Sequence, residues 1–503
     1  MSELETSAAG ATGAEMKAVS LLDRALEATV QTPEDTTKEL LSVLASQAME
    51  GSLTWDQNVG VTIRKAVVEI DKLMSQQMSA IMQNKKFRTL EGSWRGLQKV
   101  VRETELGSSQ KIRLVDYNKE ELLEQFEDAP AVDRSPLFEA LYQDEFGTAG
   151  GEPYGVLIGD YFFGCGDEDV ALLTYMAETA AACHAPFVAA TGAEMFEYQS
   201  FESFAEGRPV AAGFDSPTYA AWNGFRDSDD SRYVTLTLPA TLARLPYGQN
   251  GGSAKTFEYN ELATDADGNQ RPSKNSELVW SNAAYETALK MNDAFTAYGW
   301  CTAIRGLENG GKVTQLPNLT FKSEAGDLQQ QCPTEVNLTD EREKELSDLG
   351  FLPLVHYKNT SHAVFIGSQT TQRPKNYVDL DATSNAAISA RLPYVMASSR
   401  IAHYLKVMGR DMLGSNLEAG DVQKDLQSWI DQYTNAGAMG NDERSRTPLA
   451  ESRIDVIEQP GKPGAYSAVL ICVLGYSSKS CLRRCVWLRK FQANAKYVPI
   501  LGK

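Results

Sequence analysis

The chain lacks three features that would tie it to common partners or locations. It has no basic excess: 48 Lys and Arg stand against 67 Asp and Glu, a formal net charge of -19 at pH 7. Nucleic acids and anionic membranes bind basic surfaces, so neither is expected as the main partner. Because no run of eighteen or more apolar residues is present, no membrane insertion is expected. The N-terminus lacks the basic start and apolar stretch of a secretory signal.

Cysteines in a disulfide pattern are also missing. There are 7 cysteines, an odd number, most of them scattered, with Cys472, Cys481 and Cys485 close together near the C-terminus. This arrangement does not resemble a disulfide framework, which favours a reducing compartment. We therefore predict a cytoplasmic protein.

Patterns of catalytic or metal-binding residues are scarce. The chain has 4 histidines, and its sequence contains no HExxH motif and no C-x2-C motif. A G-x-S-x-G nucleophile motif is also missing. His184 follows a predicted helix, so a role at the helix C-terminus or in core packing is favoured over metal ligation. The sequence predicts no cofactor, no metal and no enzymatic activity.

One segment does resemble a nucleotide-binding loop. In GLENGGKV, Gly306, Gly311 and Lys312 match the G-x4-G-K spacing of a P-loop. However, Val313 replaces the Ser or Thr that holds magnesium, and Pro317 falls within the helix that a P-loop must open. A glycine-rich turn between strands fits better, and a P-loop-like NTPase is the weaker alternative.

What the chain does have is the composition of a large globular protein. Its 503 residues exceed the size at which one core usually stops growing, so at least two subdomains are expected. Residues 1–17 are small and polar and are predicted to be disordered. Residues 18–55 are predicted to form a helical segment, residues 56–469 a core of two subdomains, and residues 470–503 an unusual tail.

Alternating short strands and helices predict an α/β fold of mixed sheets and helices for the core. The helices include DVALLTYMAETAAACH and YETALKMNDAFTAYG. The strand-like runs are KIRLVDY, YGVLIGDYFF, PFVAAT, RYVTLTL, TAIRG, LPLVHY and AVFIG.

An apolar helix face is predicted in FRTLEGSWRGLQKVV. Its members recur at spacings of three and four and are Phe87, Leu90, Trp94, Leu97 and Val101. Glu91 and Arg95, four apart, can form an ion pair along the same helix. Periodicity alone leaves open whether this face packs in the core or forms an interface.

A second, shorter apolar stripe lies in SLLDRALEATV, near the N-terminus. Ser20 can cap this helix, and Leu21, Leu22 and Leu26 share one of its faces. The stripe can either pack on the following helix or bind a partner.

Several segments together resemble the large subunit of the contractile sheath of the bacterial type VI secretion system, the TssC/VipB family. The resemblance runs in order from about residue 19 to residue 468. It is carried by FRTLEGSWRGLQKVV, PYGVLIGDYFF, DSRYVTLTLPATLARLPYG, NAAYETALKMNDAFTAYGWCTAIRG, CPTEVNLTDEREKELSDLGFLPL and ARLPYVMASSRIAHYLKVMGRD.

The resemblance implies a contractile-sheath core and a structural role. Members of this family pair with a small sheath subunit (TssB/VipA), and further protomers polymerise around an inner tube of haemolysin-coregulated protein (Hcp) on a baseplate. Contraction of the sheath ejects the tube, a device of bacterial competition. A sheath subunit of a phage-derived injection particle is the remaining alternative.

The resemblance also implies a recognition helix. In the family, the AAA+ ATPase ClpV binds a short N-terminal helix of the large subunit, and residues 20–30 occupy that place. Leu21, Leu22 and Leu26 are the expected contacts.

The tail departs from the family pattern. PGKPGAYSAV agrees with it, but LICVLGYSSKSCLRRCVWLRKFQANAKYVPILGK does not. Codons can be chosen so that a shifted reading frame encodes a family-like end. We therefore hypothesise a frameshift near Leu470 in the gene or its recorded sequence.

Overall fold

The structure is a computed structural model. It describes residues 42, 59–205, 209–248, 259–261, 274–322, 327–412, 418–437, 440–458, 466–474 and 485–488. The predicted disordered residues 1–17 and the stripe of Leu21, Leu22 and Leu26 lie outside the described residues. The chain divides into two compact units, one of Met1–Phe87 with Pro246–Ala263 and one of Arg88–Leu245 with Thr264–Lys503.

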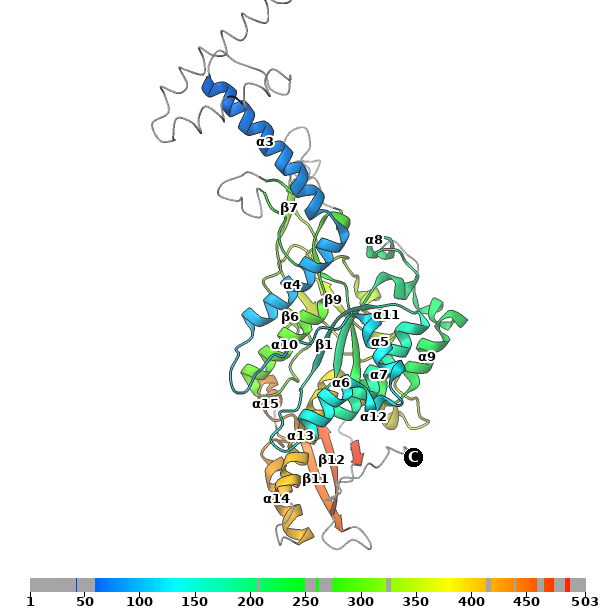
Figure 1. The fold of residues 1–503 in the computed structure, drawn as a ribbon. Helices are drawn as coiled ribbons and strands as arrows, with labels where there is room; N and C mark the ends of the chain where they lie inside the picture. Colours follow the sequence, from blue (N-terminus) through cyan, green and yellow to red (C-terminus); the bar gives the residue numbers. More distant parts are fainter. Residues whose placement is uncertain are drawn as a thin grey trace, which may run out of the picture. The chain divides into compact units, whose positions relative to one another are not determined.

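The larger unit contains a six-stranded sheet, which confirms the predicted α/β class (Figure 1). Four neighbouring strands run parallel and the last two are antiparallel to their neighbours. In sheet order the strands are β1 (Leu157–Phe163), β2 (Phe187–Thr191), β3 (Val234–Leu238), β9 (Phe351–His356), β10 (Ala363–Phe365) and β6 (Lys312–Val313).

Helices cover both faces of this sheet, as the continuous burial of its inner strands requires. On one face, α7 (Asp167–Cys183) and α9 (Ala220–Asp227) pack with Ala189 and Leu236. On the other, α10 (Ala283–Tyr298) and α13 (Leu392–Asp411) pack with Val188. Val188 and Ala189 are neighbours in β2, so the two-residue period of the strand assigns them to opposite faces.

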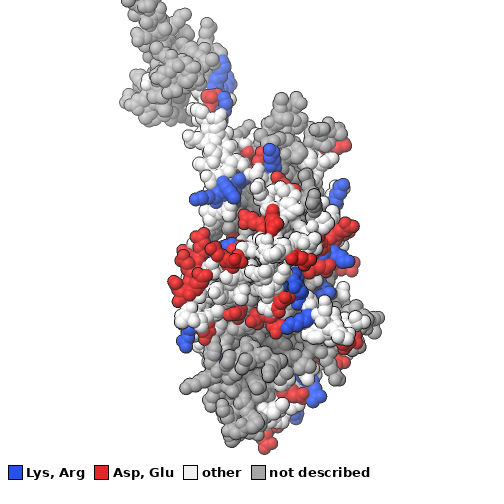
Figure 2. Space-filling view, turned by 90° about the vertical axis from the view of Figure 1, so that its right-hand side faces the viewer, with Lys and Arg blue, Asp and Glu red and all other residues white. Residues whose placement is uncertain are grey.

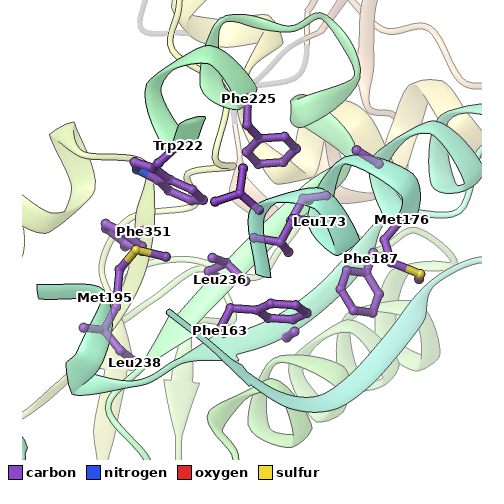
Figure 3. Packing of buried hydrophobic residues seen from close by; sticks show 14 of the residues in the cluster. Phe163, Leu173, Met176, Phe187, Met195, Trp222, Phe225, Leu236, Leu238 and Phe351 are labelled. Carbon is purple, nitrogen blue, oxygen red and sulfur yellow. The ribbon is translucent and has the colours of Figure 1, made fainter. Parts of the chain in front are cut away.

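The first of these cores is rich in aromatic side chains (Figure 3). The Trp222 indole stacks on the Phe351 ring, with centroids 5.6 Å apart and planes 9° apart. Both side chains are fully buried, and Phe196 adds an edge contact to Phe351 at 5.1 Å. Around them lie Phe163, Leu173 and Met195 and the other buried side chains of the cluster, from strands and helices alike.

A second sheet follows near the C-terminus. It has three antiparallel strands: β11 (Leu449–Glu458), β12 (Tyr466–Leu474) and β13 (Cys485–Leu488). A third core beneath it joins α13, α14 (Ala419–Asp431) and the strands through Ile430, Ile454 and Leu470.

The remaining described elements of the larger unit are short or peripheral. The helices are α5 (Lys119–Asp128), η1 (Val132–Arg134), α6 (Pro136–Phe138), η2 (Glu139–Phe146), η3 (Ala193–Phe196), α8 (Phe201–Ala205), η4 (Ala211–Asp215), η5 (Pro217–Tyr219), η6 (Asp230–Tyr233), η7 (Asn275–Glu277), α11 (Asp340–Asp348), α12 (Leu380–Ser389) and α15 (Asn441–Arg446). Two further two-stranded sheets pair β4 (Thr241–Leu242) with β5 (Trp280–Ser281) and β7 (Thr320–Lys322) with β8 (Leu328–Gln330).

Two predicted strands are wrong. TAIRG forms turns with a single bridge from Arg305 to Gly310, because Gly306 and Gly310 reverse the chain there with positive φ. KIRLVDY, residues 111–117, forms no strand because no neighbouring strand pairs with it in the described chain. The other five predicted strands and the two predicted helices α7 and α10 are confirmed.

The smaller unit is represented mainly by the long helix α3 (Val59–Met82). Ser79 and Tyr259, whose hydroxyls lie 3.3 Å apart, connect α3 to residues 259–261. Helix α4 (Lys85–Glu103) begins in this unit and continues through the larger one. No described helix has both the length and the apolarity that crossing a bilayer requires.

Candidate partner-binding helices

The glycine-rich segment 306–313 is a tight turn and has no P-loop geometry. The Gly311 N–H donates to the Gly306 carbonyl at 3.0 Å, and the Arg305 N–H donates to the Asn309 carbonyl at 3.1 Å. Strand β6 follows directly, with Val313 buried. Because a phosphate-binding loop must lead into a helix N-terminus, this geometry excludes the NTPase alternative at this segment.

His184 ends a helix, as predicted. It is the C-cap of α7, in the left-handed region at φ 54°, and is buried. Its Nδ1 lies 3.2 Å from the Tyr233 hydroxyl. Within the described ranges, no three His, Cys, Asp or Glu side chains converge in a metal-binding group.

Two glycines lie on the side of α4 that packs against the larger unit. Gly92 and Gly96 are buried against the first turn of α10 and the residues just before it. A Cβ at Gly92 would overlap the carbonyl oxygen of Trp280, and one at Gly96 would overlap the ring of Tyr285. Glycine costs a helix about 1 kcal/mol relative to alanine, so two glycines four residues apart indicate close backbone approach. Sequence reasoning missed this signal.

Ion pairs fix α4 in this position. The Glu91 carboxylate accepts from Arg95 at 2.7 Å, the predicted pair, and also from Arg244 at 2.5 and 2.9 Å. Burial alone raises the pKa of Glu91, but the bonds from Arg244 and Arg95 hold that pKa below its ordinary value. Lys99 pairs with the buried Glu286 of α10 at 2.6 Å.

The apolar face of α4 therefore points away from the body of the larger unit. Leu90 is 56% exposed and Trp94 60% exposed, while Leu97 between them is half-buried. Phe87, which ends the first segment of the smaller unit, is 38% exposed. The structure brings the predicted face together on one side of the helix, and this side is not part of the described core.

Helix α3 also exposes apolar side chains. In the smaller unit, Ile63, Val67, Ile70, Met74 and Ile81 are all exposed. Their spacings fit a heptad repeat in which Gln77 occupies the remaining seam position. A solitary helix gains nothing in water from such a seam, which is typical of helices that pair with another helix.

The surface charge agrees with the composition. Figure 2 shows carboxylate side chains spread over the described part of the face that it draws, interspersed with fewer lysines and arginines. Some lysine and arginine side chains of the described chain form ion pairs with carboxylates, such as Lys119 with Asp169 at 2.6 Å. A continuous basic surface of the kind that binds a phosphate backbone is not visible on this face.

Two family models match the chain. The EvpB/VC_A0108 tail sheath N-terminal domain matches residues 64–372. The EvpB/VC_A0108 tail sheath gpW/gp25-like domain matches residues 381–476.

Relatives with curated names and solved structures were also found. The chain is 39% identical over 477 residues to the type VI secretion system sheath protein TssC1 of Pseudomonas aeruginosa, covering 93% of this chain and 94% of that one. A chain of the anti-feeding prophage baseplate gives a TM-score of 0.34 at 12% identity, covering 82% of this chain and 86% of that chain. A chain of a contracted extracellular injection-system sheath gives 0.32 at 10% identity, covering 66% and 68%. TM-scores this low do not establish a shared fold.

Proposed function

The chain belongs to the VipB/TssC family of type VI secretion sheath proteins, and we propose that it acts by pairing with a small sheath subunit and polymerising around an inner tube. In this proposal contraction is a transition between two packings of the same protomers. The chain needs no catalytic centre for such work, because the free energy is held in contacts between protomers. We therefore propose a structural protein without enzymatic activity.

The outward apolar face of α4 is the observation that carries the proposal. Gly92, Gly96 and the Glu91 ion pairs fix the helix so that Leu90 and Trp94 face away from the core. Burying each of these side chains against a partner would contribute about 1.5–3 kcal/mol. Exposed clusters of this kind on an otherwise well-packed chain mark interaction sites. Phe87, Leu90, Trp94 and Leu97 are the proposed contacts with the small subunit, and Arg95 positions them through Glu91.

The seam of α3 supports a helical partner. Ile63, Val67, Ile70 and Met74 follow the four-three-four spacing that a second helix covers in a coiled coil. We propose that a helix of the small sheath subunit lies along this seam.

Electron microscopy of the chain co-expressed with the small subunit tests the proposal. We expect hollow helical tubules. Replacing Ile70 and Met74 of the seam by Asp should abolish the tubules, whereas Gln76→Asp, exposed but off the seam, should not. Soluble single chains from the wild-type pair, with no affinity between the two proteins, would refute it.

The remaining partners are proposed from family membership and sequence. They are the inner tube protein, the baseplate and the ClpV ATPase, all meeting a cytoplasmic sheath. Leu21, Leu22 and Leu26 are the proposed ClpV contacts. Replacing Leu22 and Leu26 by Asp should leave assembly intact but stop disassembly of contracted sheaths by the ATPase; unchanged disassembly would overturn the assignment.

The tail after Leu470 carries a separate proposal. The family match ends at residue 476, and the sequence that follows departs from the family pattern. We propose a frameshift near Leu470 as the origin. Resequencing the 3′ end of the gene decides the matter, since an intact frame with this tail would rule the frameshift out.

A further inference from the structure

The segment between α4 and α5 has a strand-forming sequence without a strand beside it. Residues 111–117 read KIRLVDY, and Ile112 and Val115 are β-branched residues of the kind that favour strands. Among the described residues, no backbone-to-backbone hydrogen bond reaches residues 111–116. The N–H and C=O groups of this segment, called the open segment below, therefore have no strand partner in the described part of the chain.

Alternate residues fasten the open segment to the chain. Lys111 pairs with Glu152, and Arg113 pairs with Glu145. Arg113 also donates to the Tyr154 hydroxyl at 3.2 Å, with its guanidinium 5.6 Å from the ring centroid. These contacts hold the segment in place and neutralise its two cations.

The side chains between and beyond these attachments are exposed. Leu114 is 66% exposed and Val115 56% exposed, and Ile112 is also exposed. In an extended chain, Ile112 and Leu114 alternate with the fastened Lys111 and Arg113 and so occupy the opposite side. A row of unpaired backbone groups beside apolar side chains is a template for an added strand.

The open segment continues the outer face of α4. The residues that link them are tied to α10: Asn292 of α10 donates to the Thr104 hydroxyl at 2.7 Å, and Gln110 donates to the Thr296 hydroxyl at 2.8 Å (Figure 1). Val101, near the end of α4, and Leu106, between α4 and the open segment, are both exposed. Exposed apolar side chains therefore recur along the chain from Trp94 to Leu114.

We propose that the protein docked on α4 contributes a β-strand that pairs with the open segment. This inference rests on the proposed function, in which that protein is the small sheath subunit. The added strand carries apolar residues at alternate positions, which cover Ile112 and Leu114 while its backbone bonds to residues 111–116. The open segment is then an unfinished part of a sheet that two proteins complete together.

Hydrogen exchange in the purified pair of subunits is the first test. Amides of residues 111–116 should exchange at least about a hundredfold more slowly than unstructured amides, because ladder hydrogen bonds protect them. Exchange of these amides at the unstructured rate would overturn the proposal. The measurement needs no variant, so misfolding cannot mimic either result.

A pair of proline variants supplies the second test. Leu114→Pro removes one N–H from the open segment and should weaken pairing of the subunits about tenfold, the cost of roughly one hydrogen bond and its apolar contact. Ser109→Pro, exposed but outside the segment, should leave pairing unchanged. Equal affinity for both variants would contradict strand pairing.

A photocrosslinking residue in place of Leu114 identifies the occupant. Adducts with the small subunit support the proposal, whereas adducts only with a second copy of this chain overturn it. Trp94→Ala separates the two claims. If it leaves pairing intact, the docking on α4 has failed; if it weakens pairing while residues 111–116 exchange freely, only the added strand has failed.

Discussion

The aromatic core beside the central sheet and the outer face of α4 use the same kinds of side chain in opposite ways. Trp222 is fully buried and stacked on Phe351, so residues of the same chain cover its apolar surface. Trp94 is 60% exposed, although it belongs to a helix that ion pairs fix in place. The core holds the free energy that folds one chain, and the α4 face holds free energy that is released only when a partner covers it.

The largest effect is expected inside the core. Trp222→Ala removes a fully buried ring that stacks on Phe351 and should lower the free energy of unfolding by about 3–5 kcal/mol. Denaturant unfolding measures the change. Leu328→Ala, on a side chain 75% exposed, is the control and should change stability little. Similar losses for both variants would contradict the assignment of Trp222 to the core.

The next effect concerns association and not folding. Trp94→Ala should unfold like the wild type but bind the small subunit at least about thirtyfold more weakly, because aromatic anchors dominate interface energies at about 2 kcal/mol or more. Arg102→Ala, exposed on another side of α4, should keep wild-type affinity. Titration calorimetry or a surface-binding assay measures both. A loss of stability in Trp94→Ala would show that Trp94 contributes to the core, as Trp222 does, and would contradict the comparison of the two tryptophans.

A smaller effect is expected where α4 meets the larger unit. Gly92→Ala places a Cβ against the backbone oxygen of Trp280, which cannot move cheaply. The strain should exceed the gain in helix propensity and leave a net loss of about 1–2 kcal/mol. Gly107→Ala, with nothing within 4 Å of its Cβ, is the matched control. Equal thermal unfolding of the two variants would show that α4 does not approach so closely.

The smallest effect depends on pH. Burial, with the nearby Glu202 carboxylate, raises the pKa of Glu335 from 4.5 to about 7. The folded chain therefore keeps a proton that the unfolded chain loses between pH 4.5 and about 7, so this group makes stability fall as pH rises through that window. Glu335→Gln should stabilise the protein by on the order of 1 kcal/mol at about pH 8 and by much less at about pH 5.

Thermal unfolding at the two pH values measures the difference. Glu341→Gln, on the exposed side of α11, serves as the control. A gain from Glu335→Gln that does not depend on pH would show that the carboxylate is not the cause.

Strand prediction succeeded where the partner strand lies in the same chain. PFVAAT and LPLVHY became β2 and β9 because other strands flank them on both sides. KIRLVDY also contains strand-favouring residues, yet nothing in its own sequence indicates that no described strand pairs with it. Strand propensity measures how well a segment's side chains suit a β-sheet. The neighbouring strands must come from elsewhere in the chain or from another protein.

Periodicity likewise predicted the apolar face of α4, but not whether this face points toward the core or away from it. The three-four spacing of Phe87, Leu90, Trp94 and Leu97 is the same for a core helix and an interface helix. The direction is decided by Gly92 and Gly96, which allow close contact on the opposite side of the helix. It is also decided by the bond that Arg244 donates to Glu91, 153 residues away. A distant ion pair of this kind leaves no local pattern in a sequence.

Hydroxyl-radical footprinting of intact sheaths, read at Trp94 by mass spectrometry, tests the central claim most directly. If assembly covers the α4 face, Trp94 will oxidise nearly as slowly as the buried Trp222 and far more slowly than in denatured protein. Oxidation of Trp94 at the denatured rate in intact sheaths would contradict the account.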